Sequence, residues 1–225
     1  MEKGTLYIIA SPIGNIEDIT LRAVRILRDE ADLIYCEDTR HTKKILAAYG
    51  ITAPAMSLHA HSSETKISKA VEYLNSGNCA VYMTDSGTPS ISDPGAKLVR
   101  AAIEAGISVI PVPGPSALAS AVSVSGFTGK NIIFSGFLSK KEGRRRNELK
   151  RLADFEGMIV VYESPYRIRG LLADIAQVFP ESDVFVAREM TKLYEEYLSF
   201  KGADALKATA EMKELGEFTV LINNG

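Results

Sequence analysis

Short apolar runs that end in a loop and are followed by a helical pattern recur along the first half of this sequence. Such runs occupy residues 5–10, 33–36, 79–83 and 108–112, and a polar or Gly- and Pro-containing loop follows each of them. Apolar, β-rich runs of this length, bounded by turn-forming residues, predict buried strands. Because strands that alternate with helices build a parallel sheet with helices on both faces, the first half is predicted to be an α/β unit.

Helices are expected between these strands. The first would be capped by Asp18 or Thr20 and run through Leu27, because both residue types favour the N-cap position. Further helices are expected over about 39–49, 64–75 and 96–105, and the segment 58–61 is expected to close a weak third strand.

The alternation of strands and helices is interrupted at residues 126–130, a segment with two glycines that separates two series of elements. Strands are then predicted over 131–137, 158–162, 183–187, 196–200 and 218–222, with helices ending near Phe155 and Val178 and one beginning near Ala203. We therefore expect two α/β domains, residues 1–126 with a mostly parallel sheet and residues 127–225 with a smaller mixed sheet. Two such domains imply a cleft between them.

The loop over residues 84–95 follows the third of the apolar runs and is the most distinctive of the strand-end loops. It reads Thr-Asp-Ser-Gly-Thr-Pro-Ser-Ile-Ser-Asp-Pro-Gly. Loops at the carboxyl ends of parallel strands bind ligands in open α/β sheets. Here Gly87 permits close backbone approach, Thr88 supplies a hydroxyl, and Asp85 and Asp93 supply carboxylates. The alternative is an ordinary polar turn in which Asp93 caps the next helix.

Composition limits the kind of protein. Hydrophobic residues make up 46% of the chain and charged residues 24%, as in soluble globular proteins. The N-terminus does not read as a signal peptide, and no apolar stretch reaches the roughly 20 residues that span a bilayer. Cys36 and Cys79 each lie in an apolar run, which favours core packing and a cytoplasmic location. His59 and His61 have no further ligand nearby in the pattern, so no metal site is indicated.

Positive charge is concentrated in one segment although the net charge is −2. The segment 140–151 holds seven basic and two acidic residues, and neutralising phosphates is the main sequence-independent source of affinity for nucleic acids. Its candidate RNA contacts are Lys140, Lys141, Arg144, Arg145 and Arg146. The alternative is a solvated helix face.

Seven motifs occur in order along the chain. They are Leu6-Tyr7-Ile8 with Ser11-Pro12-Ile13-Gly14-Asn15, Cys36-Glu37-Asp38-Thr39-Arg40, Asp85-Ser86-Gly87-Thr88-Pro89 with Ser92-Asp93-Pro94-Gly95, Pro113-Gly114-Pro115-Ser116-Ala117, Gly136-Phe137-Leu138, Tyr162-Glu163-Ser164-Pro165 and Arg188-Glu189-Met190-Thr191-Lys192. Together they resemble the small-subunit ribosomal RNA ribose methyltransferases of the tetrapyrrole methylase superfamily, and the resemblance covers essentially the whole chain. It implies two α/β/α domains with S-adenosylmethionine in the cleft between them, a homodimer, and methylation of a cytidine ribose in the decoding region of 16S rRNA.

The resemblance also implies positions for the cofactor. The candidate cofactor-binding residues are Pro12, Asp85, Gly87, Thr88, Pro89, Ile91, Ser116, Ala117, Tyr162, Glu163, Arg188, Glu189, Met190, Gly216 and Glu217. Two positions depart from the family pattern, because the sequence has His61-Ser62-Ser63 where His-Asn-Glu is expected and Asp-Ser-Gly where Asp-Ala-Gly is usual.

A base near the ribose hydroxyl would assist the transfer of a methyl group by accepting the proton. The candidate proton acceptors are Asp85, Glu163, Glu189 and His61. Arg40 and Arg188 are candidates for binding phosphate or the cofactor carboxylate, or alternatively for surface or interdomain ion pairs.

Two other functions stay open at this stage. One is a methyltransferase that acts on a tetrapyrrole or another small molecule, which would have little use for a basic segment. The other is a noncatalytic RNA-binding module that keeps the fold and does not bind the cofactor.

Overall fold

The computed structural model describes residues 3–59, 62–92 and 95–225. The chain divides into two compact units, Met1–Ser116 and Ala117–Gly225, here called the first and the second unit. Helix α5 (Ala117–Ser125) belongs to the second unit because it packs against strand β10 (Phe218–Asn224). The expected boundary, after residue 126, lies one helix further along the chain.

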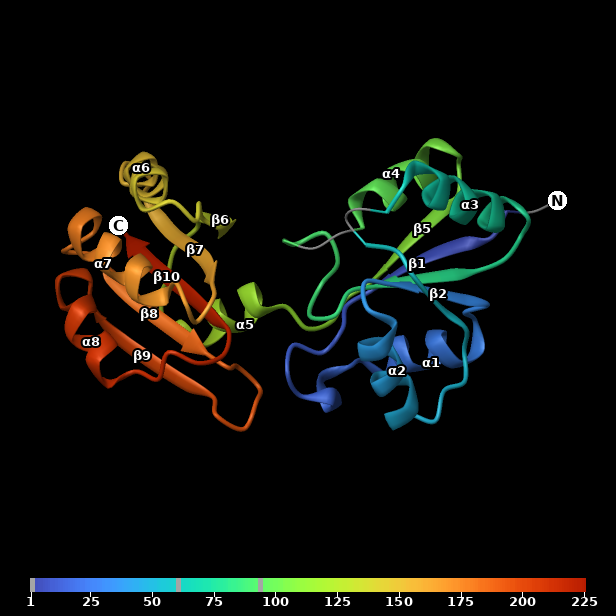
Figure 1. The fold of residues 1–225 in the computed structure, drawn as a ribbon, viewed down its shortest axis with the longest axis horizontal. Helices are drawn as coiled ribbons and strands as arrows, with labels where there is room; N and C mark the ends of the chain where they lie inside the picture. The colour runs from blue at the N-terminus through green and yellow to red at the C-terminus, as the bar shows by residue number, and fades with distance from the viewer. Residues whose placement is uncertain (1–2, 60–61, 93–94) are drawn as a thin grey trace. The chain divides into compact units, whose positions relative to one another are not determined.

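The first unit is built on a parallel sheet, as the alternation of elements predicts (Figure 1). Its strands are β1 (Thr5–Ile9), β2 (Leu33–Cys36), β3 (Ala55–Ser57), β4 (Ala80–Met83) and β5 (Ser108–Val112), in the order β3-β2-β4-β1-β5. Every pair of neighbouring strands in this sheet is parallel. All four loops that follow β1, β2, β4 and β5 therefore lie at one edge of the sheet.

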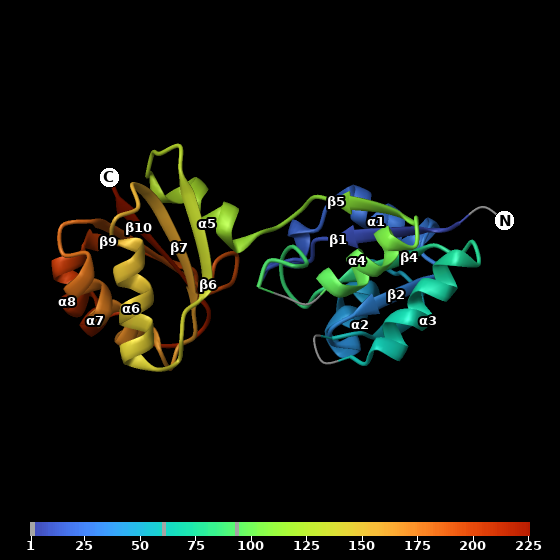
Figure 2. The ribbon, with the colours of Figure 1, turned by 90° about the horizontal axis from the view of Figure 1, so that it is seen from above.

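Helices cover both faces of this sheet (Figure 2). The helices of the first unit are α1 (Leu21–Asp29), α2 (Thr39–Ala48), α3 (Glu64–Asn75) and α4 (Ala96–Glu104), with a short 3-10 turn η1 at Ile16–Asp18. Alternation along β4 divides the core, because Val81 and Met83 pack with α1 and α2 whereas Tyr82 packs with α3 and α4. The two buried clusters fix both helix layers against the sheet.

The boundaries of the elements agree with the sequence-based expectations only in part. Thr20 caps α1, and its side-chain oxygen accepts a hydrogen bond from Ala23 N at 3.1 Å. The third strand was expected to close at 58–61, but β3 ends at Ser57, and the Leu58 N–H after it donates to Cys36 O at 2.7 Å. Ala60, His61, Asp93 and Pro94 lie outside the described residues, and with them the expected cap at Asp93.

The second unit has the mixed sheet that the sequence predicts. Its strands are β6 (Ile132–Phe137), β7 (Gly157–Glu163), β8 (Asp183–Arg188), β9 (Glu196–Lys201) and β10, in the order β6-β7-β10-β8-β9. Only β6 and β7 pair in parallel, and the other neighbours are antiparallel. The last strand along the chain is thus the central strand of its sheet.

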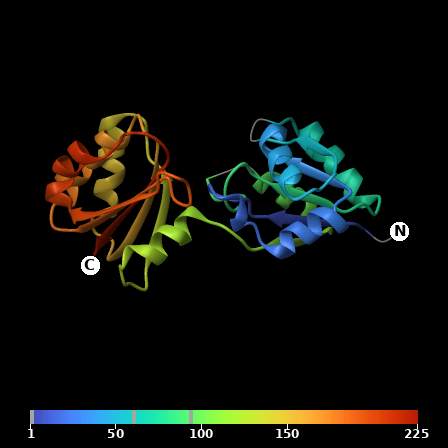
Figure 3. The same ribbon diagram turned by 90° about the horizontal axis from the view of Figure 1, so that it is seen from below.

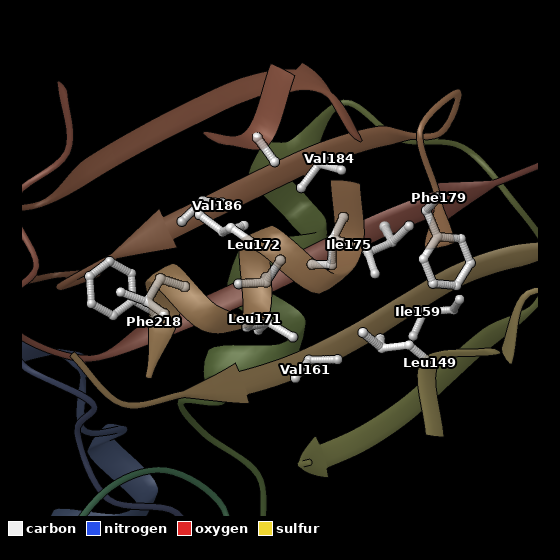
Figure 4. Close-up of a cluster of buried hydrophobic side chains, with 14 of the residues drawn as sticks. Leu149, Ile159, Val161, Leu171, Leu172, Ile175, Phe179, Val184, Val186 and Phe218 are labelled. Atoms are coloured by element: carbon white, nitrogen blue, oxygen red, sulfur yellow. The ribbon is translucent and has the colours of Figure 1, made fainter. Parts of the chain in front are cut away.

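Helices α6 (Glu142–Leu152), α7 (Ile168–Val178) and α8 (Ala205–Glu211), with a 3-10 turn η2 at Gly202–Asp204, accompany this sheet. Figure 4 shows how Leu171, Leu172 and Ile175 of α7 pack against the strands. Val184 and Val186 point to this cluster, whereas Phe185 contacts Phe127 on the side where α5 lies (Figure 3). The second unit therefore also has helices on both faces of its sheet.

Within the described residues, no helix is long and apolar enough to cross a lipid bilayer. Cys36 and Cys79 are both free thiols, the first of them buried.

Candidate functional site

Three strand-end loops of the first unit are hydrogen-bonded into one structure at the carboxyl edge of the sheet. Ser11 and Gly87 exchange backbone hydrogen bonds of 2.8 and 3.0 Å, so the loop after β1 is paired with the loop after β4. The Thr88 hydroxyl donates to Pro115 O at 3.1 Å and joins the loop after β5. The expected cofactor-binding residues of these loops are therefore held close together.

The backbone of the loop after β4 has an uncommon shape. Gly87, Ser90 and Ser92 have φ angles of 76°, 69° and 65°. The left-handed region is natural for glycine but uncommon for serine, and such residues gather at sites where the surrounding structure imposes the conformation. Two non-glycine residues of the described part of this loop, Ser90 and Ser92, therefore adopt this conformation.

Asp85 connects this loop to the loop after β2. Its Oδ1 accepts a hydrogen bond from Asp38 N at 3.1 Å. Asp38 in turn caps α2 and pairs with Arg40, and the Arg40 side chain beside it lowers the pKa of Asp38 to about 2. Arg40 is 87% exposed, so it can still meet a phosphate from its outer side.

Glu37 was not among the candidate site residues, although it lies in the same loop. Burial raises the pKa of its carboxyl group, and the charge of Asp85 raises it further. A nearby negative charge disfavours the charged form of a carboxyl group, here that of Glu37. The sequence feature that could have identified Glu37 is the pair of acidic residues, Glu37 and Asp38, directly after a buried strand.

The other first-unit candidates lie in these loops or next to them. Pro12 and Pro89 are buried, and Ile91 and Ser116 are half-buried. Ala117, the next residue, opens α5 of the second unit. His61, a candidate proton acceptor, lies outside the described residues.

In the second unit, Glu163 at the end of β7 is turned into the fold. Its side chain is fully buried, Oε1 accepts from Ser164 N at 2.8 Å, and Oε2 lies 3.1 Å from Arg167 Nη2. The same Arg167 nitrogen donates to Leu138 O at 2.6 Å and so holds the loop after β6. Glu163 and Arg167 thus connect the end of β7 to the loop after β6. Arg167, four residues away, was the missed partner.

Tyr162 precedes Glu163 and faces the opposite side of the strand. Its hydroxyl accepts a hydrogen bond from Leu118 N at 3.0 Å, which ties β7 to the start of α5. Its ring lies edge-on to Phe134 and Phe137, with centroid distances of 4.8 and 5.8 Å.

Arg188 and Glu189, at the end of β8, also have partners inside the second unit. Arg188 is buried, and its Nε lies 2.7 Å from Glu196 Oε2. The Glu196 carboxylate therefore balances the positive charge of Arg188 within the second unit. Burial alone would raise the pKa of Glu189, but hydrogen bonds from Lys192 and from Glu217 N outweigh it and lower that pKa. Glu189 is therefore a weak base.

Gly216 lies in close contact with the side chain of Glu189. Its φ is +93°, and a Cβ at this position would lie 2.3 Å from Glu189 Cγ. The backbone of Glu189 and Glu217 is paired at 2.9 Å beside it. Met190, the next candidate, is buried. These expected cofactor-binding residues thus form one packed group.

The basic segment divides into inner and outer charges on α6. Arg145 is buried, and its Nε lies 2.7 Å from Asp174 Oδ2 of α7. Arg146 bonds to Asp174 Oδ1 at 2.9 Å and also pairs with Glu142. The expected RNA contact at Arg145 is corrected accordingly, since its guanidinium is enclosed by the fold.

The outer charges of this segment are Lys140, Lys141, Arg144, Lys150 and Arg151. All five are exposed, and none has an ion-pair partner in the part of the chain that the structure describes. Within the same described residues, no three His, Cys, Asp or Glu side chains form a group that would hold a metal ion.

Residues 5–205 match the sequence model of the Tetrapyrrole (Corrin/Porphyrin) Methylases. The chain belongs to the tetrapyrrole methylase family. Membership confirms the family resemblance and the two-domain α/β fold class that the motifs indicate.

Two sequence relatives within the tetrapyrrole methylase family match this chain over nearly its whole length. Ribosomal RNA small subunit methyltransferase I of Leptospira biflexa is 43% identical over 99% of this chain and 92% of its own. The protein of the same name from Thermotoga maritima is 45% identical over 98% of both chains. Their name is that of the group that the seven motifs resemble.

Solved structures of tetrapyrrole methylases share the fold at much lower identity. Uroporphyrin-III-C-methyltransferase from Thermus thermophilus has a TM-score of 0.68 at 17% identity and covers 99% of this chain and 95% of its own. A second structure of that enzyme, complexed with S-adenyl homocysteine, has a TM-score of 0.65 at 18% identity over 97% of both chains.

Proposed function

We propose that this protein transfers a methyl group from S-adenosylmethionine to the ribose 2′-oxygen of a cytidine in the decoding region of 16S rRNA. The observation that carries the proposal is the 43% and 45% identity, over nearly the whole chain, to proteins named ribosomal RNA small subunit methyltransferase I. The class of enzyme, a methyltransferase acting on the RNA of the small ribosomal subunit, follows from these relatives. The choice of the 2′-oxygen and of cytidine is the finer part of the proposal.

The residues of the first unit suit the cofactor. S-adenosylmethionine supplies a methyl group on a positively charged sulfur, together with an amino acid head and an adenosine. The backbone around Gly87 and Thr88, which hydrogen bonds join to the loops after β1 and β5, offers amide and carbonyl groups to the cofactor, and Asp85 lies two residues before Gly87. Pro12, Pro89, Ile91 and Ser116 would complete this part of the site.

In the second unit we propose contacts from the packed group around Gly216. Met190 offers an apolar surface, and the paired backbone of Glu189 and Glu217 offers further polar groups. Tyr162, which is hydrogen-bonded to the start of α5, and Ala117 are further proposed contacts. Glu163 and Arg188 support these elements from inside the fold.

Asp85 is the proposed proton acceptor among the described residues. Glu163 is paired with Arg167, and the pKa of Glu189 is lowered by its partners. Asp85 uses Oδ1 for Asp38 N, and no described residue is hydrogen-bonded to its Oδ2. Taking the proton of the attacking hydroxyl is worth about 10²-fold in rate, whereas most of the acceleration comes from positioning and exclusion of water.

The first test is methyl transfer from radiolabelled S-adenosylmethionine to small ribosomal subunits and to free 16S rRNA, with nuclease mapping of the label. We expect label on the ribose of one decoding-region cytidine. Label on a base, or on no RNA at all although the cofactor binds, would overturn the proposal. Activity on a porphyrin-type substrate would then favour the small-molecule alternative, and RNA binding without cofactor binding would favour the noncatalytic module.

Asp85→Asn tests the proposed base within the same assay. We expect a loss of about 10²-fold in turnover, with Asp18→Asn as a matched control on the exposed turn η1. Turnover of Asp85→Asn equal to that of the control would exclude Asp85 as the proton acceptor.

We also propose that the protein acts as a homodimer on the assembled subunit in the cytoplasm. A net charge of −2 gives a single chain no overall electrostatic attraction to RNA, and a dimer would present two basic segments. Light scattering after size exclusion, alone and with subunits, measures both states, and a monomer on free rRNA would contradict the proposal.

A further inference from the structure

A hollow of about 390 Å³ lies in the second unit between strand β6 and helix α6. Ser135, Phe137 and Leu138 line it from the strand and the loop that follows, and Glu148, Arg151 and Leu152 line it from the helix. Nothing in the proposed cofactor site uses these residues. The hollow contains the Gly136-Phe137-Leu138 motif, to which the cofactor and the proposed base give no role.

Phe137 is a large apolar side chain that remains 57% exposed at the rim of this hollow. Its position is fixed from behind, because its ring lies edge-on to Tyr162. The loop after it is fixed as well, since Arg167 bonds to Leu138 O at 2.6 Å and Glu148 Oε2 accepts from Ser139 N at 2.9 Å. A rigid exposed aromatic ring is a surface on which a nucleobase can stack.

Positive charge adjoins the ring. Arg151 lines the hollow and is exposed, and Arg144 lies two helical turns before it on the same face of α6, about 10 Å along the axis. Neither has an ion-pair partner among the residues that the structure describes. The carboxylate of Glu148, between them on the helix, is engaged by Ser139 N. The hollow therefore combines a stacking surface with two cations suited to successive parts of a phosphate backbone.

We infer that this hollow binds an unpaired nucleotide of the rRNA, with its base on Phe137 and its phosphates at Arg151 and Arg144. The inference rests on the proposed function and adds a binding site to it. The occupant is RNA because the ring is bordered by unpaired cations. A nucleotide held here would fix the strand while the target ribose is presented elsewhere.

The test measures the affinity of the full chain for a short fluorescein-labelled oligocytidylate and its dependence on salt. Phe137→Ala is expected to weaken binding about tenfold, the loss typical of one stacked base, whereas Phe137→Trp retains it. Arg151→Ala is expected to reduce the salt slope by about 0.7. Affinity for S-adenosylmethionine is expected to stay unchanged in all three variants.

Matched controls lie on the same unit. Leu206→Ala removes a side chain with 55% exposure on α8, and Lys213→Ala removes an exposed cation beyond that helix. Both should bind the oligonucleotide like the unsubstituted protein. Phe137→Ala binding as tightly as Leu206→Ala would overturn the inference, and so would a change in oligomeric state or in cofactor affinity that accounts for its loss.

The two proposals fail in different ways. If the unsubstituted protein binds the oligonucleotide but transfers no methyl group to rRNA, the proposed function fails and the nucleotide site stands. If it methylates rRNA and the Phe137 variants leave RNA affinity and the KM for rRNA unchanged, only the nucleotide site is overturned. Failure to bind any RNA overturns both.

Discussion

Asp174 is the residue on which the inner charges of helix α6 converge. Its side chain is 1% exposed and accepts from both Arg145 and Arg146. The pairing fixes the helix through one face and leaves Arg144, on another face, to the solvent. A run of three arginines in the sequence is thus divided into two with a structural partner and one that is available to a ligand.

Asp174→Ala is expected to lower the free energy of unfolding by about 3–5 kcal/mol, because it leaves the Arg145 guanidinium buried without a partner. Urea unfolding followed by circular dichroism measures the loss. Glu142→Ala, which removes the exposed partner of Arg146, should cost less than about 1 kcal/mol. Equal effects of the two substitutions would show that the buried pair contributes no more than a surface pair.

Tyr7 carries the clearest pH-dependent interaction of the first unit. Its hydroxyl donates to Glu30, and that hydrogen bond raises the pKa of Tyr7 from 10.0 to about 12. The unfolded chain loses this proton first, so the contribution to stability is complete below pH 10.0 and is lost as the pH rises towards about 12.

The expected result is a steeper fall of unfolding free energy with pH in the unsubstituted protein than in Tyr7→Phe, measured by urea unfolding across that range. Identical slopes would mean that the hydrogen bond to Glu30 is absent in solution.

At the scale of elements, the turn between α8 and β10 depends on Gly216. Gly216→Ala must adopt a φ of +93° and brings its Cβ within 2.3 Å of Glu189 Cγ. We expect a loss of stability of more than about 1 kcal/mol and weaker binding of S-adenosylmethionine, measured by thermal unfolding and calorimetry.

Gly126→Ala is the control that separates the cost of a positive φ from the cost of the clash with Glu189. Gly126 also has a positive φ, +71°, but nothing lies within 4 Å of the Cβ it would gain. Gly126→Ala should lose only the stability that an alanine at a positive φ costs, and its affinity for S-adenosylmethionine should be unchanged. If both variants bind the cofactor equally well, the group around Glu189 is not part of that site.

Local patterns were sufficient to predict most of the elements. Helix α3 begins at Glu64 and ends at Asn75, and α7 ends at Val178, as the spacing of apolar residues and the flanking breakers indicate. The parallel first sheet followed from alternation alone. The strand-end loops, which carry most of the candidate site, could be found for the same reason.

Long-range pairing could not be predicted in this way. Asp174 and Arg145 are 29 residues apart, and nothing local in either segment marks the pair. The central place of β10 depends on contacts with β7 and β8, which no periodicity encodes. Glu163 and Arg167 are only four residues apart, but Glu163 ends β7 and Arg167 precedes α7, so no helical or strand periodicity marks the pair.

At the scale of the whole molecule, RNA affinity should depend on where the charge lies and little on its total. Replacing Lys140, Lys141 and Arg144 together by Ala is expected to reduce the salt slope of rRNA binding by about 2, since each phosphate contact contributes about 0.7. Replacing Lys66, Lys69 and Lys97, exposed on the first unit, removes the same charge and should leave the slope unchanged. Filter binding over a salt series measures both, and equal slopes would contradict a local RNA contact.

The central position of β10 also determines when the second unit can form during translation. All five strands of the first unit have been made once residue 112 is reached, so its sheet can close while the ribosome is still extending the chain. The second sheet has to wait for residues 218–224, because β7 and β8 are joined only through that strand. The groups around Glu163, Glu189 and Gly216 therefore assemble last. A nascent chain that stops short of β10 would carry a finished first unit and an incomplete second sheet, so under the proposed function the complete chain has to be made before it can transfer a methyl group.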